Sequence, residues 1–294
     1  MQKHAYLIMA HNNFPLLLEL ITMLDHERHT IYLHIDQKVS DAQFLQLKKD
    51  YETKKQELHL CSPLIFTERI SVHWGGYSQI ACELLLLRTA AREDHYAYYH
   101  LLSGSDLPIK TPEQILSFFD QQVEKVNGGC EFLAFDSPTV PAYVRERISL
   151  YHIFRESSHP LAEPLDALFT RLQRICKVDR LKKLPLNIQK GANWFSITDA
   201  FVRYALSKED WIARTFGRSV CADELFLQTL AVNSQFADRI YAPYGDANSM
   251  SNLRYVDWER GANNNPYVFQ PEDRELLLSL PHLFARKFQF NIFK

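Results

Sequence analysis

Apolar and polar residues follow two alternating patterns along the chain. Short, mostly apolar runs predict buried strands at residues 5–9, 31–35 and 96–102. Longer runs, whose apolar residues recur three and four positions apart, predict helices at 14–24 and 80–91. Because strand-like and helix-like runs alternate, the pattern predicts an α/β protein with a mostly parallel central sheet flanked by helices.

Further stretches extend this alternation over the rest of the chain. One more helix is predicted at 41–55, and another at 111–119 begins with a Thr111/Gln114 capping box and Pro112 in its first turn. The other stretches that continue the alternation lie at 58–60, 130–135, 194–197, 199–206, 223–232, 239–242 and 253–258.

Composition limits the class of protein. The 294 residues, of which 46% are hydrophobic, are enough for one large domain, and the charged helical stretches at about 143–183 predict a helical insert within a single domain spanning 1–294. The net charge of −2 gives no reason to expect a nucleic-acid partner. Five scattered cysteines without a C-x-x-C spacing favour a reducing compartment over a disulfide framework or a zinc site.

Polar residues directly after the predicted strands are the first candidates for a site, because ligands of open α/β sheets bind beyond the carboxyl ends of strands. Four places qualify: Asp36, Ser103–Asp106, Asp136 and Asp257–Arg260. An aspartate after a strand is more often a turn residue bonded to its own backbone, so each position alone leaves both interpretations open. Trp74 in "WGGYS" is equally open between a structural turn and stacking on a sugar.

Several nucleotide-binding and catalytic motifs are absent from the sequence. No two of the seventeen aspartates are separated by one residue, so there is no D-x-D to hold a divalent metal against a diphosphate. There is also no phosphate loop, G-x-G-x-x-G turn, H-E-x-x-H or G-x-S-x-G. Basic residues can neutralise a diphosphate instead, and Arg286 and Lys287 in "HLFARKF" are candidates. A solvated basic tail is the alternative, although the flanking leucine and phenylalanines would pin these cations to the protein.

Asp223 and Glu224 in "DELFLQTL" stand directly before a helix-like apolar run. Either they only begin a helix, or one of them is a catalytic base. Together with "AYLIMAHNNFPLLLELI", "IYLHIDQKVS", "HWGGYSQIACELLLLRTA", "YYHLLSGSDLPIKT", "KGANWFSITDAFVRYAL", "LRYVDW" and "PHLFARKF", this stretch resembles the core-2/I-branching β-1,6-N-acetylglucosaminyltransferase family. That family also contains peptide O-xylosyltransferases and bacterial relatives, and the matching stretches occur in order over nearly the full chain.

The resemblance implies a glycosyltransferase with the A-type, Rossmann-like fold that inverts the anomeric centre without a metal or other cofactor. It implies that Glu224 is the general base and that Lys287 contacts the diphosphate, while Asp223 caps the helix. The expected donor is a UDP-sugar, most simply UDP-GlcNAc. Donor-side residues are then His11, Asp36, Ser103, Asp106 and Lys287, with Arg254, Arg260 or Arg286 in place of a second family arginine. Acceptor-side residues are Asp136, Arg145, Arg147, Tyr151 and Trp258.

The expected acceptor is a glycan, in a reaction of β-1,6 type that builds surface polysaccharide or glycolipid. Because the sequence shows no stem or anchor segment, we expect a bacterial-type, cytoplasmic enzyme. A lipid-linked acceptor would bring it to the inner face of the membrane. The alternatives are a UDP-xylose, UDP-glucose or UDP-galactose transferase of the same fold, and a glycan-binding relative without activity. A nucleoside-diphosphate hydrolase is disfavoured because no metal-binding cluster is evident in the sequence.

Overall fold

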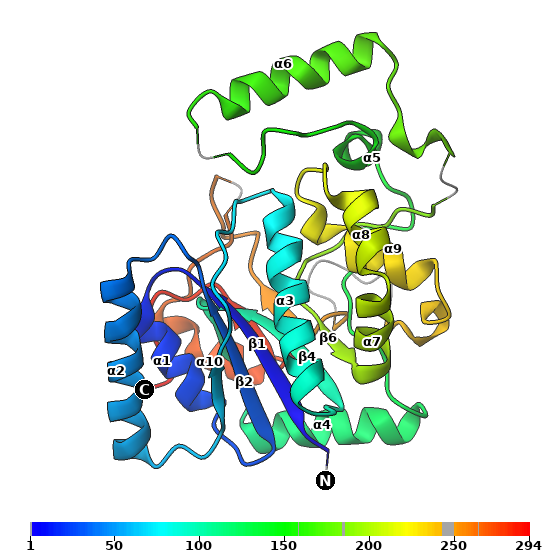
Figure 1. Ribbon diagram of the computed structural model, residues 1–294. Helices are drawn as coiled ribbons and strands as arrows, with labels where there is room; N and C mark the ends of the chain where they lie inside the picture. The colour runs from blue at the N-terminus through cyan, green and yellow to red at the C-terminus, as the bar shows by residue number, and fades with distance from the viewer. Residues whose placement is uncertain (1, 158, 184–185, 243–249, 264) are drawn as a thin grey trace.

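The computed structural model describes residues 2–157, 159–183, 186–242, 250–263 and 265–294. Its centre is a five-stranded sheet in the order β3-β2-β1-β4-β6 (Figure 1). Neighbouring strands are parallel except β6, which runs antiparallel to β4. The mostly parallel sheet predicted from the sequence is thus confirmed. The strands are β1 (His4–Ala10), β2 (His29–Ile35), β3 (Leu64–Phe66), β4 (Tyr98–Ser103) and β6 (Ser196–Thr198).

Both faces of this sheet are buried, as expected for parallel strands connected by helices. Along β1, Ala5 and Leu7 belong to one apolar cluster, whereas Tyr6 and Ile8 belong to the other. Successive side chains point to opposite faces, so a nearly continuous apolar run serves both cores. The first core is covered by α3 (Tyr77–Glu93), α7 (Asp199–Ser207), α8 (Glu209–Phe216) and α9 (Phe226–Val232). The second is covered by α1 (Phe14–Met23), α2 (Asp41–Leu58), α4 (Pro112–Lys125) and α10 (Arg274–Ser279).

A second, three-stranded sheet was not predicted. Its order is β5-β8-β7, formed by Asp106–Pro108, Phe284–Arg286 and Arg254–Val256 respectively. Strand β8 comes from the "HLFARKF" stretch and pairs antiparallel with β5, so that Arg286 lies opposite Asp106. This pairing brings the C-terminal cations to the end of β4.

Four local predictions differ from the structure. No strand forms at 58–60, because α2 continues through Leu58 and ends at His59 in a left-handed conformation. The stretches 130–135 and 239–242 make only isolated bridges. The predicted helix at 223–232 is two pieces, a 3-10 turn at Ala222–Glu224 and then α9, with Leu225 between them outside helical geometry. Short apolar runs carry too few residues to define a period, so they do not distinguish a strand from a helix end.

In its described residues, the segment at 143–183 contains two helices and a turn, in line with its helical pattern. They are α5 (Ala142–Ser149), α6 (Ala162–Ile175) and a 3-10 turn at Arg180–Lys183. Figure 1 shows α6 at the top of the view, well away from the central sheet. Short 3-10 turns also occur at Ala237–Arg239 and Pro271–Asp273. Among the helices that the structure describes, none combines the length and apolar character needed to cross a membrane.

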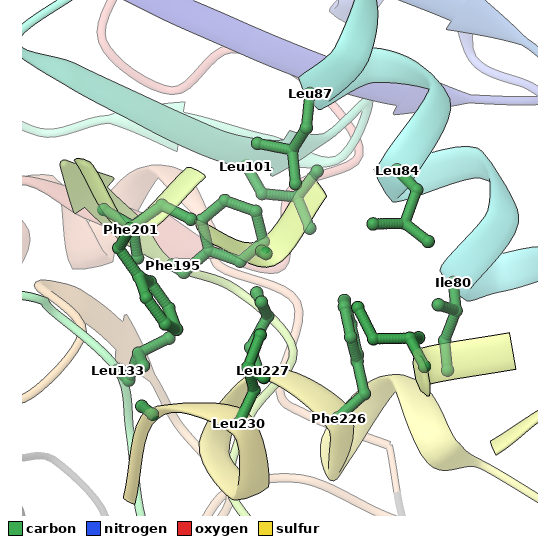
Figure 2. Packing of buried hydrophobic residues seen from close by; sticks show 14 of the residues in the cluster. Ile80, Leu84, Leu87, Leu101, Leu133, Phe195, Phe201, Phe226, Leu227 and Leu230 are labelled. Atoms are coloured by element: carbon green, nitrogen blue, oxygen red, sulfur yellow. The ribbon is translucent and has the colours of Figure 1, made fainter. Parts of the chain in front are cut away.

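The core around α9 anchors the chain directly after Glu224 (Figure 2). Phe226, Leu227 and Leu230 are buried and pack in one cluster with apolar residues of α3 and the central sheet. The capping box predicted at Thr111 and Gln114 is present at the start of α4. Core packing therefore fixes the position of α9, directly after Glu224, and local capping fixes the start of α4.

Removing part of this core should unfold the protein more easily. Leu230 is 4% exposed, so Leu230→Ala should lower the free energy of unfolding by about 2–5 kcal/mol. Leu45 on α2 is 57% exposed, and Leu45→Ala should change that free energy by less than about 0.5 kcal/mol. Urea unfolding followed by circular dichroism measures both variants. Equal shifts of the two midpoints would show that the α9 core does not have the stabilising role assigned to it.

Candidate active site

A large open cleft of about 1370 Å³ lies where β1, β2 and β4 end. Typical small-molecule pockets have about 300–1,000 Å³, so this cleft has room for a nucleotide-sugar and part of a second substrate. Its walls come from the segments that follow these strands and from β7, β8 and the loop before β6. The position agrees with the general rule for open α/β sheets.

Glu224 lines this cleft from the 3-10 turn that precedes α9. Its Oε2 atom accepts a hydrogen bond of 2.7 Å from Arg147 Nη1, and Lys190 Nζ lies 3.6 Å from the same oxygen. The backbone N–H of Gly191 donates to the Glu224 carbonyl at 3.0 Å. Both cations meet one oxygen, and no described residue hydrogen-bonds to Oε1. A carboxylate fixed by one oxygen with the other open is suited to accept a proton from a substrate hydroxyl.

Lys190 is a site residue that the sequence did not reveal. Its ammonium group donates to Asp136 Oδ2 at 2.5 Å and also faces Glu224. Burial opposes the charged form, but the hydrogen bond to Asp136 and the charges of Glu224 and Asp136 outweigh burial and raise the pKa of Lys190. A lone lysine before glycine in "KGANWF" has no periodicity or spacing that would have identified it.

Asp223 does not have the capping role expected for it. The residue at the cap position of α9 is Leu225, and no side chain caps that helix end. Asp223 is buried instead, and its Oδ2 accepts a hydrogen bond of 3.0 Å from Gln79 Nε2 on α3. Burial, followed by the charge of Glu224, raises the pKa of Asp223 to about 7. Glu83 lies on α3, as Gln79 does, and burial raises its pKa as well, with the charge of Asp223 as the second cause.

Arg286 and Lys287 both reach the cleft at the end of β8. Arg286 Nε lies 3.4 Å from Asp106 Oδ1, and its guanidinium group lies over the Trp194 ring, 4.3 Å from the centroid. Lys287 forms no ion pair with any residue that the structure describes. A partly exposed ammonium group without an ion-pair partner among the described residues, beside a fixed guanidinium group, can bind the oxygens of an anion such as a diphosphate.

Arg254 lies at the floor of the cleft and is almost fully buried. Its guanidinium group donates to Ser196 Oγ at 2.8 Å and to the Leu101 carbonyl at 3.2 Å, and also to the carbonyls of Phe195 and Asn252. Burial lowers the pKa of Arg254 to about 9. These bonds use most of its donors, so Arg254 joins β7 to β4 and β6.

The other predicted donor-side residues lie in different surroundings. His11, Asp36 and Ser103 line the cleft, and Asp36 also accepts a turn hydrogen bond from the Lys38 N–H at 2.9 Å. Asp106 is buried outside the lining, where its Oδ2 accepts from the Ser103 N–H at 2.6 Å. It therefore shapes the turn and holds Arg286.

The predicted acceptor-side residues are only partly brought together. Asp136 and Trp258 line the cleft, as does Trp74, and the two tryptophans are 55% and 80% exposed. Arg147 reaches the site through its bond to Glu224. Away from the lining, Arg145 pairs with Asp179 and Tyr151 lies beneath Arg180. Arg260, a predicted donor-side residue, also lies outside the lining and pairs with Asp257 and Asp273.

Within the described residues, no group of three or more histidines, cysteines, aspartates or glutamates is arranged to hold a metal ion. Several cationic side chains line the cleft, among them those of Arg286, Lys287 and Arg254.

Comparison with known proteins places this cleft in a family context. The family described as Core-2/I-Branching enzyme matches residues 4–276. Human Xylosyltransferase 2 is 22% identical over 315 residues, which cover 98% of this chain and 32% of the relative. Xylosyltransferase oxt of Drosophila melanogaster is 24% identical over 92% of this chain and 30% of its own length. The human N-acetyllactosaminide β-1,6-N-acetylglucosaminyl-transferase is 24% identical over 98% of this chain and 69% of the relative. The chain thus spans about a third of the length of the xylosyltransferases that it matches.

The raised pKa of Asp223 leads to a pH-dependent prediction. The folded protein holds this proton up to about pH 7, whereas an unfolded aspartate releases it near its ordinary value of 3.8. Between these values the unfolded chain is ionised at Asp223 while the folded protein keeps the proton, so rising pH favours the unfolded state and lowers the stability of wild type. Asn cannot ionise, so Asp223→Asn lacks this loss. The stability of Asp223→Asn relative to wild type should rise by on the order of 1 kcal/mol per pH unit in this window and then level off.

Urea unfolding of wild type and Asp223→Asn at a series of pH values across this window tests the prediction. Asp210→Asn serves as a matched control, because Asp210 is exposed on α8. Parallel stability profiles for wild type and Asp223→Asn would show that this carboxyl does not hold its proton in the folded protein.

Proposed function

Because the chain belongs to the Core-2/I-branching enzyme family, we propose that it is an inverting, metal-independent glycosyltransferase of the A-type fold. It transfers a sugar from a UDP-sugar to a hydroxyl group of a glycan. The observation that carries this proposal is the placement of Glu224, which lies partly buried in the wall of the cleft, fixed through Oε2 by two cations, with no described residue hydrogen-bonded to Oε1.

In the proposed reaction, Glu224 removes the proton of an acceptor hydroxyl while that oxygen attacks the anomeric carbon. The new bond joins the acceptor oxygen to this carbon, and the bond from the carbon to the diphosphate breaks on the opposite face. The electron pair leaves with UDP, whose added negative charge Lys287 and Arg286 stabilise. The proton ends on Glu224. Inversion follows from attack opposite the leaving group.

Arg147 and Lys190 act as positioning residues in this mechanism. They hold the carboxylate through Oε2, so that Oε1 remains available to the acceptor. Lys190 in turn is held by Asp136, which extends the arrangement along the wall of the cleft. A general base must be held within hydrogen-bond reach of the proton it removes, and this chain of ion pairs provides that constraint.

The proposed donor is UDP-GlcNAc and the proposed bond is of the β-1,6 type. The similarity to the human β-1,6-N-acetylglucosaminyl-transferase, which extends over 98% of this chain, supports this choice. A xylosyl donor is the second candidate, because proteins named xylosyltransferase match over a comparable share of the chain. Trp74 and Trp258 expose aromatic faces at the cleft, which suit the apolar side of an acceptor pyranose.

The test of the base is the release of UDP from UDP-GlcNAc and UDP-xylose in EDTA, with glycoside acceptors. Glu224→Gln should lower acceptor-dependent turnover by about 100-fold or more, because general-base catalysis contributes roughly that much. Its affinity for UDP should stay at the wild-type value. Glu57→Gln, a change on the exposed side of α2, is the matched control and should retain full activity. Near-full activity of Glu224→Gln, or loss of wild-type turnover in EDTA, would contradict the mechanism.

Two lysines of the cleft should separate into different kinetic roles. Lys287→Met removes an ammonium group with no ion-pair partner among the described residues and should weaken UDP binding by about tenfold. Lys190→Met removes a group that holds Glu224, so it should lower kcat and leave the Kd for UDP unchanged. Calorimetric titration with UDP and steady-state kinetics measure the two effects, and each variant is the control for the other. The same loss of UDP affinity in both variants would be inconsistent with these roles.

A further inference from the structure

Helix α6 turns its apolar side to solvent. The exposed apolar residues recur at spacings of four and three, so they form one stripe along the helix. Their exposed fractions are 43% or more. They are Leu161, at the helix cap, and Leu165, Leu168, Leu172 and Ile175. A row of five large apolar side chains on one exposed helix face is unusual for a monomeric protein and marks a binding surface.

The inner side of the same helix is polar. Asp166, Thr170 and Gln173 are buried against the loop that follows α5. Asp166 Oδ2 accepts from Arg155 Nε at 3.2 Å, and the Gln173 side chain makes two hydrogen bonds of 2.8 Å with the backbone of Tyr151. The usual arrangement of a surface helix, with its apolar side inward, is thus reversed. Specific polar bonds fix α6 in an orientation that leaves the leucine stripe uncovered.

Positive charge is concentrated in the same part of the chain. Residues 143–183 contain nine basic and five acidic residues, whereas the whole chain has a net charge of −2. Asp166 and Asp179 are already paired with arginines. Arg171 and Lys177 are exposed beside or just beyond the stripe, and Arg174, also exposed there, pairs with Glu146 at 2.9 Å. An apolar stripe flanked by cations matches the two requirements for binding at an anionic lipid surface.

We propose that the outer face of α6 binds the surface of an anionic lipid membrane. The leucine stripe enters the boundary between head groups and acyl chains, while the neighbouring lysine and arginines contact the lipid phosphates. A second copy of the chain is a weaker partner for this face. Two such surfaces carry the same charge and repel each other, and a stripe of only two heptads is short for a stable coiled coil.

The helix that carries the proposed lipid-binding face is joined to the cleft through α5 and the segment between α5 and α6, to which α6 bonds at Tyr151 and Arg155. Arg147 on α5 bonds to Glu224, and the Glu156 side chain accepts from the Ser78 N–H in the first turn of α3, which follows the loop that carries Trp74. A membrane bound at α6 would therefore hold the acceptor side of the cleft in a fixed relation to the lipid. This position suits an acceptor sugar carried on a lipid, a consequence that rests on the proposed function. Binding of α6 to lipid does not depend on that function.

Vesicle sedimentation tests the surface directly, without nucleotide or acceptor. Wild type should bind vesicles of phosphatidylcholine mixed with phosphatidylglycerol. Its affinity for vesicles of phosphatidylcholine alone should be lower by about tenfold or more. The double variant Leu165→Glu/Leu172→Glu should lose about tenfold or more of the binding to anionic vesicles. Arg171→Gln/Lys177→Gln should weaken binding and reduce its dependence on salt.

The matched control is Leu45→Glu/Leu58→Glu, which changes two exposed leucines on α2 and should bind as wild type does. Unchanged circular dichroism and urea midpoints show that the α6 variants remain folded. The proposal would be overturned if wild type did not bind anionic vesicles, or if the Leu165→Glu/Leu172→Glu variant bound them with wild-type affinity. A wild-type dimer in lipid-free solution that this variant converts to a monomer would overturn it too. UDP release failing in every variant would count against the proposed function but leave the vesicle result intact.

Discussion

A parallel sheet buried on both faces leaves only its edges and strand ends for polar chemistry. Ala5 and Leu7 face one core while Tyr6 and Ile8 face the other, so β1 has no side free for a ligand. The cleft accordingly begins where β1, β2 and β4 end. The position of the site thus follows from the burial of the strands rather than from any motif.

The charges of the cleft come from segments far apart in the sequence, and the small second sheet explains how they meet. Strand β8 pairs with β5, which places Arg286 beside Asp106, and Arg254 ties β7 to the ends of β4 and β6. On the other wall, Arg147 from the helical segment meets Glu224. Cations thus gather on two sides of the cleft, one beside the carboxylate and one where a diphosphate would bind.

The sequence predicted the parts of this structure that long apolar patterns specify. The strands near 5–9, 31–35 and 96–102 and the capped start of α4 are confirmed, because burial and capping act on neighbouring residues. The second sheet was missed, because each of its strands has three residues and its central strand β8 pairs with β5, which lies far earlier in the sequence. Lys190 was missed for a similar reason: its role lies in its contacts with Asp136 and Glu224 and not in its sequence neighbours.

The resemblance implied a catalytic role for Glu224, but only the structure shows which charged groups surround its carboxylate. Behind it lie Asp223 and Glu83, whose burial raises the pKa of each carboxyl. A raised pKa favours the neutral form of a carboxyl and so reduces the negative charge beside Glu224. The cations Arg147 and Lys190 stand on the open side and meet a single oxygen. This asymmetry, with buried acids of raised pKa on one side and cations on the other, fixes the carboxylate through one oxygen, as the proposed role of Glu224 as a base requires.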